Sequence, residues 1–134
     1  MIQDEIQQII DYAYPKIQKY YGKGSLEIPK IELHKDIYAR LSGIEDMEGD
    51  ASKTSKAEYD CDEDNCPNKI YVYYPNVESE EDLLRSLVHE YTHYLQEDLP
   101  SLKKTYTQAY DYDSNPFEIE AHSAEEDWHL FSQK

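Results

Sequence analysis

The segment most suited to chemistry is LVHEYTHYLQ at residues 87–96, in which two histidines stand four positions apart. On a helix, residues four apart are neighbours on one face, so His89 and His93 can point at a single ion. Zinc binds imidazole nitrogen at about 2.1 Å. Glu90 lies to one side of that face, where it could reach a metal-bound water without binding the metal. The spacing therefore predicts a zinc site with a general base beside it.

These residues need a helix to position them, and the flanking pattern predicts one from about Glu80 to Glu97. Its apolar stripe consists of Leu83, Leu84, Leu87, Val88, Tyr91, Tyr94 and Leu95. Ser79 and Asp82 resemble an N-capping pair, and Pro100 should stop the helix. The histidines fall opposite the stripe, so we expect a second polar element to meet them there. The alternative is a histidine pair on a solvated helix face.

Zinc needs a third protein ligand, and the segment NPFEIEAHSAEED at residues 115–127 contains two candidates for it, Glu118 and Glu120. Asn115 is a good N-cap and Pro116 suits the first helical position, so a last helix is predicted here. Its buried stripe is expected to contain Phe117, Ala121, Ala124, Trp128 and Phe131. Glu118 and Glu120 lie on either side of this stripe, and helix geometry does not choose between them. Glu118 could also be the returning half of a capping box.

Two classes of zinc protease are excluded by the residues after the histidine pair. A metzincin would have glycine and a third histidine at the positions of Gln96 and Leu99, and the inverted His-x-x-Glu-His order is absent. The remaining pattern is one in which a glutamate on a later helix completes the site.

Residues 69–131 resemble the gluzincins, the thermolysin-like zinc metallopeptidases, and especially their minimal single-domain members. The likeness lies in the strand rich in tyrosine and isoleucine before the HExxH helix, and in the Glu-Ile-Glu-Ala stretch that begins at Glu118. The resemblance implies one zinc ion per chain, bound by His89, His93 and Glu118, with Glu120 as the second choice of ligand. It implies a zinc metalloendopeptidase with Glu90 as catalytic base. His122 stands where the wider group often has an aspartate that orients a histidine ligand; it could make such a bond or bind the metal itself.

Three tyrosines, one strand and three acidic loops are the candidates for substrate contacts. Tyr106, Tyr110 and Tyr112 precede the last helix and are candidates to stabilise the oxyanion, with simple packing as the alternative. A peptide could add to the strand at residues 69–74 if that strand is a sheet edge. Acidic loops at residues 45–50, 60–64 and 78–82 would favour basic peptides.

The rest of the chain predicts a single α+β domain over residues 1–134, with a small mixed sheet. An amphipathic N-terminal helix is indicated by Ile2, Ile6, Ile9, Ile10, Ala13 and Ile17, with Pro15 expected to kink or end it. Strands are predicted at residues 28–33, with a continuation of the sheet at 36–41 after a bend, and in a hairpin at 57–61 and 69–74. Residues 42–57 and 101–114 are expected to be a surface loop and a connection.

The net charge of −16 excludes direct binding to nucleic acid and to anionic membranes. No stretch approaches the roughly 18 apolar residues of a membrane span, and the first ten residues lack the basic region of a secretory signal. We therefore expect a cytoplasmic monomer. In that compartment Cys61 and Cys66 are expected to be free thiols, although two cysteines five apart could bridge a tight hairpin.

Two rival functions remain. A catalytically weak or inactive protein of zincin fold could bind and regulate a basic partner protein, with which its acidity is compatible. A zinc-dependent hydrolase of non-peptide amides is the other. The residues of the HExxH pattern and Glu118 are all present, which argues against an inactive site.

Overall fold

The computed structural model describes residues 1–36, 40, 55–61 and 66–133. In these ranges the chain forms helices α1 (Gln3–Tyr21), α3 (Glu80–Gln96), α4 (Pro100–Ala109) and α5 (Pro116–Ala124), and strands β1 (Lys30–His34), β2 (Ala57–Asp60) and β3 (Lys69–Tyr73). Short 3-10 helices follow at η1 (Tyr74–Asn76), η2 (Tyr112–Ser114) and η3 (Glu125–Leu130). The predicted α+β class is confirmed.

The three strands form a mixed sheet in the order β1-β3-β2. β1 runs parallel to β3, with Ile31 opposite Ile70, and β2 runs antiparallel to β3, with Tyr59 opposite Ile70. The predicted hairpin is therefore confirmed. β3 is the central strand, so the expectation that residues 69–74 could be an edge open to substrate is wrong. The edge strand on the side of the site is β2.

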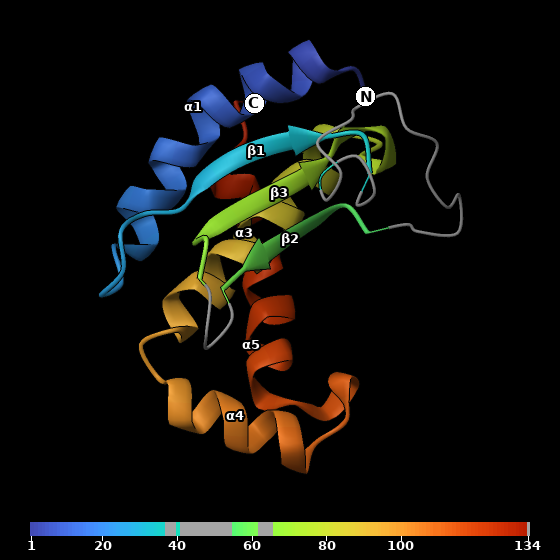
Figure 1. The fold of residues 1–134 in the computed structure, drawn as a ribbon. Helices are drawn as coiled ribbons and strands as arrows, with labels where there is room; N and C mark the ends of the chain where they lie inside the picture. The colour runs from blue at the N-terminus through green and yellow to red at the C-terminus, as the bar shows by residue number, and fades with distance from the viewer. Residues whose placement is uncertain (37–39, 41–54, 62–65, 134) are drawn as a thin grey trace.

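One hydrophobic core lies between the sheet and the two long helices. Ile70 and Val72 of β3 are fully buried, and so are Ile6 and Ile17 of α1 and Leu87 of α3. Figure 1 shows α1 along one side of the sheet, α3 behind it, and α4 and α5 extending away below. α3 thus has one face in the core and another face turned toward α5.

Two expected helix boundaries differ in the structure. Pro15 does not end α1 but lies inside it, and the helix continues to Tyr21, with Gly22, at φ of 84°, as its C-cap as expected. A proline removes one backbone donor, but the core contacts of Ala13 and Ile17, both fully buried, continue on either side of it. Residues 101–114 were expected to be a connection, but they contain α4. Pro100 begins this helix, and the fixed φ of proline suits the first helical position.

Cys61 and Cys66 form a disulfide bond that joins the ends of β2 and β3. The expectation of free thiols is wrong for this structure. Asp60 of β2 pairs with Lys69 of β3, so the two strand ends lie side by side. The Cα atoms of the two cysteines next to them are 3.9 Å apart.

Several predictions fall wholly or largely outside the described residues: the strand at 36–41, the loop at 42–57, and the acidic loops at 45–50 and 60–64. In the part of the chain that the structure describes, no helix is both long enough and apolar enough to cross a membrane.

Candidate metal site

Helix α3 presents the histidine pair as the sequence predicts. The Asp82 N–H donates to the Ser79 hydroxyl at 3.1 Å and caps the helix. The apolar stripe faces the core, and the opposite face lies against α5 and η3. His89 is only 8% exposed there, so the histidine pair lies in an interface and not on a solvated surface. The second polar element expected to meet the histidines is α5 with η3.

Three potential ligand atoms converge at this interface. The Nε2 atoms of His89 and His93 lie 3.1 Å apart. Glu118 Oε1 lies 2.5 Å from His93 Nε2 and 3.5 Å from His89 Nε2. The α5 N-cap is formed by the Asn115 side chain, which accepts from the Phe117 N–H at 2.9 Å. The Glu118 carboxylate is therefore at the histidines, and the first turn of α5 is capped without it.

The other ring nitrogen of each histidine has its own partner. His89 Nδ1 lies 2.8 Å from Glu125 Oε2, and His93 Nδ1 lies 2.7 Å from Gln96 Oε1. Neither Glu125 nor Gln96 was identified from the sequence. Each is nevertheless marked by helical spacing, because Gln96 follows His93 by three positions and Glu125 follows Glu118 by seven.

The donor set fits a cation such as zinc. With both Nδ1 atoms directed at acceptors, the two Nε2 lone pairs and the Glu118 carboxylate face one another, and only a proton or a metal ion between them relieves the repulsion. Glu118 Oε2 is buried without a hydrogen-bond partner among the described residues, which is costly for a carboxylate oxygen. Two imidazoles and one carboxylate are the ligands typical of catalytic zinc. His89, His93 and Glu118 could hold a metal ion.

Without a metal ion, the positive charge at this site is a protonated histidine surrounded by carboxylates. Burial alone lowers the pKa of His89, but Glu118, Glu90 and Glu125 together raise it to about 9. Burial alone raises the pKa of Glu118, but its bonds to the two histidines hold it well below the usual range. In the absence of metal, a proton on His89 therefore compensates the negative charge.

Glu90 lies beside the three ligand atoms without being one of them. Its Oε1 accepts a hydrogen bond from the Tyr59 backbone N–H of β2 at 2.8 Å, and its Oε2 lies 4.0 Å from His89 Nε2. Burial raises the pKa of this carboxyl, against the opposing effect of the two histidines. One oxygen is thus anchored to the edge strand while the other is directed toward the site.

The remaining residues singled out in the sequence are only partly brought to the site. His122 is half-exposed, its ring centroid lies 4.6 Å from that of His89, and its Nδ1 lies 2.9 Å from Glu125 Oε2. Glu125, not His122, contacts the nitrogen of His89. His122, His89 and Glu125 form a second group able to hold an ion, but it shares His89 with the first.

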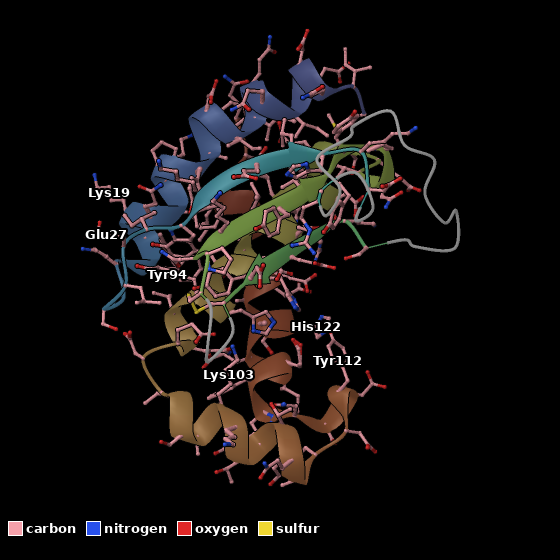
Figure 2. The ribbon with its side chains drawn as sticks, in the orientation of Figure 1. Lys19, Glu27, Tyr94, Lys103, Tyr112 and His122 are labelled. Carbon is pink, nitrogen blue, oxygen red and sulfur yellow. A yellow bond between two sulfur atoms is a disulfide. The ribbon has the colours of Figure 1, made fainter. Side chains whose placement is uncertain are left out.

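Of the three candidate tyrosines, Tyr112 contacts His122, and 61% of its surface is exposed. Its ring centroid lies 6.2 Å from that of His122, and Figure 2 shows the two residues near each other beside α5. Burial and the charge of Glu118 raise the pKa of Tyr112 to about 12, which keeps its hydroxyl a proton donor. Tyr110 packs on Tyr106, with ring centroids 5.7 Å apart.

A cavity of about 210 Å³ opens next to His89. It is lined by Lys56, Ala57, Ser86, His89, Glu90 and Glu125. The cavity therefore lies between the edge strand β2 and helix α3, with Glu90 in its wall.

No protein family, no curated protein and no solved structure matches this chain.

Proposed function

We propose that this protein is a zinc-dependent metallopeptidase. The observation that carries the proposal is the convergence of His89 Nε2, His93 Nε2 and Glu118 Oε1, with the Glu90 carboxylate next to them. Three ligands of this kind leave a coordination position for water or substrate. Four-ligand structural zinc sites have no such position, so the ligand number favours catalysis.

His89, His93 and Glu118 would hold the zinc ion. When bound in such a site, zinc lowers the pKa of water to about 7 and polarises a carbonyl group. Glu125 would keep the His89 ring oriented through its Nδ1 atom. Loss of such an outer partner typically costs about 10- to 100-fold in metal affinity or activity.

Glu90 is the proposed general base. The Tyr59 N–H holds Oε1, so the proton of the attacking water passes to Oε2, which faces the histidines. The same carboxyl then donates that proton to the leaving amine. Its raised pKa suits both steps, because the proton must be accepted and later released.

An extended peptide would lie along β2 in the cavity. Lys56 and Asp60 direct their carbonyls at β3, accepting from the Tyr73 and Asn68 N–H groups. Backbone groups of successive residues in a strand point to opposite sides, so those of Ala57 and Tyr59 point away from β3, toward the cavity and Glu90. Ala57 could add main-chain hydrogen bonds to the substrate there, and Tyr112 could donate its hydroxyl to the oxyanion.

A second candidate is a zinc-binding regulatory protein that acts on a basic partner. The observation that favours it is the net charge of −16, which would attract a cationic protein surface. It requires no proton transfer by Glu90, so replacement of this residue separates the two functions.

The test combines zinc analysis with peptide cleavage. We expect about one zinc per purified chain, and cleavage of some members of a broad peptide library. Glu90→Gln should keep its zinc and fold, while cleavage falls by about 10²- to 10⁴-fold, the usual contribution of a positioned acid–base group.

Glu81→Gln is the matched control, since it makes the same change on an exposed part of α3. It should cleave like the wild type. A Glu90→Gln protein that cleaves at the wild-type rate would refute the mechanism. A wild-type protein that binds zinc but cuts nothing in the library would favour the regulatory protein.

A further inference from the structure

Gln96 is a buried polar residue at the end of α3, and its exposed fraction is only 4%. Its amide has three partners on two elements. Oε1 lies 2.7 Å from His93 Nδ1, while Nε2 donates to the Phe117 carbonyl at 2.9 Å and to Glu120 Oε1 at 2.9 Å. The amide thus joins a ring on α3 to the backbone of α5.

The identity of these partners determines where the hydrogen atoms lie. A backbone carbonyl can only accept, so the amide group facing Phe117 must be the NH2. The amide oxygen then faces His93, and because it can only accept, His93 Nδ1 must carry a hydrogen. The Nε2 lone pair of a neutral His93 is therefore directed toward His89 and Glu118.

We propose that Gln96 is a positioning residue that fixes the tautomer and orientation of His93 and ties that ring to the first turn of α5. The proposal rests on the proposed function, because it assigns Gln96 a role toward the same metal ion. Phe117, whose carbonyl Gln96 holds, directly precedes Glu118. One amide therefore sets the positions of the second and the third ligand relative to each other.

The side chain at position 96 must both accept and donate hydrogen bonds, which an amide can do and a carboxylate cannot. A glutamate at position 96 would still accept from His93 Nδ1, but it would face the Phe117 carbonyl and the Glu120 carboxylate with no hydrogen to donate. The two histidines thus have different outer partners: a carboxylate for His89 and an amide for His93. The amide also adds no further negative charge beside Glu118 and Glu120.

The experiment measures zinc affinity by chelator competition and records the imidazole N–H signals of the zinc-loaded protein by NMR. In the wild type, the His93 Nδ1 proton should give a slowly exchanging signal, because it is bonded to a buried amide. Gln96→Met has a similar size but no polar group. It should bind zinc about 10- to 100-fold more weakly, and the Nδ1 signal should be lost to exchange.

Thr92→Val is the matched control. Thr92 is also buried on α3, at 6% exposure, but its hydroxyl bonds to the Val88 carbonyl and not to a ligand ring. It should leave zinc affinity within about threefold of the wild type, below the range expected for loss of an outer partner, and should keep the His93 signal. A purely structural role for Gln96 would make the two variants alike.

A second pair of variants keeps the proposal testable if Gln96→Met does not fold. Gln96→Glu alone should weaken zinc binding, and combining it with Glu120→Gln should restore part of the affinity. The amide at position 120 would then donate to the carboxylate at position 96, while the Phe117 carbonyl would still lack its donor. Unchanged affinity and an unchanged Nδ1 signal in Gln96→Met, or no restoration in the double variant, would overturn this role. If the wild type binds no zinc at all, the proposed function itself fails.

Discussion

The charge on His89 predicts how zinc binding should depend on pH. Its pKa is about 9 in the metal-free protein, so at pH 7 only about 1% of the rings are neutral. Zinc binds the neutral ring and must displace this proton. His89 alone should therefore make zinc affinity rise about tenfold per pH unit, or roughly 100-fold from pH 6.5 to 8.5.

The stability of the metal-free fold should depend on pH in the opposite sense. A raised pKa means that protonated His89 is favoured by the folded state. Its contribution is complete below the unfolded value of 6.5 and is lost as the pH rises through about 9. Zinc affinity should thus increase over the same window in which the metal-free protein loses stability.

The assay is calorimetric titration with zinc in two buffers of different ionisation enthalpy, which gives the number of protons released. About one proton from His89 is expected at pH 7.5. Glu118→Gln removes a carboxylate that raises the His89 pKa, so it should release fewer protons as well as bind more weakly. Glu81→Gln should behave like the wild type. Equal affinity at pH 6.5 and 8.5 in the wild type would show that the carboxylates do not hold His89 protonated.

Two further predictions concern single features of the structure. Glu118→Ala should reduce zinc affinity by more than the roughly 100-fold upper range for an outer partner, and Glu120→Ala should do far less. Chelator competition decides, and a larger loss in Glu120→Ala would make Glu120 the ligand. Cys61→Ser/Cys66→Ser should lower the free energy of unfolding by about 2 kcal/mol for so short a loop, yet keep its zinc. Thermal unfolding and zinc analysis measure both, and loss of zinc would place a ligand in the hairpin.

Features that depend on neighbours along the chain were predictable from the sequence alone. The spacing of His89 and His93 places them on one face of any helix, and the apolar stripe of α3 forces that face away from the core. Ser79 and Asn115 begin their helices for equally local reasons, since their side chains bond backbone donors within three residues. The α+β class and the β2–β3 hairpin followed from the same short-range patterns.

Local patterns also failed where packing competed with them. Pro15 does not end α1, because core contacts on both sides of it maintain the helix. α4 was missed because its residues are mostly polar and exposed, so the segment has no stripe of buried apolar side chains. The disulfide between Cys61 and Cys66 follows from strand register, which cysteine spacing does not determine.

The sequence by itself determined the residue types of the candidate ligands and the face of α3 that carries two of them; the tertiary structure decided how that face is completed. The choice of Glu118 over Glu120 depends on how α5 is rotated against α3, a relation between segments more than 20 residues apart. Glu125 and Gln96 become outer partners only through the same packing. Strand order likewise places β2 beside Glu90. Helical spacing is a property of one segment, whereas these contacts require two segments to meet, and burial of the shared core sets how they do.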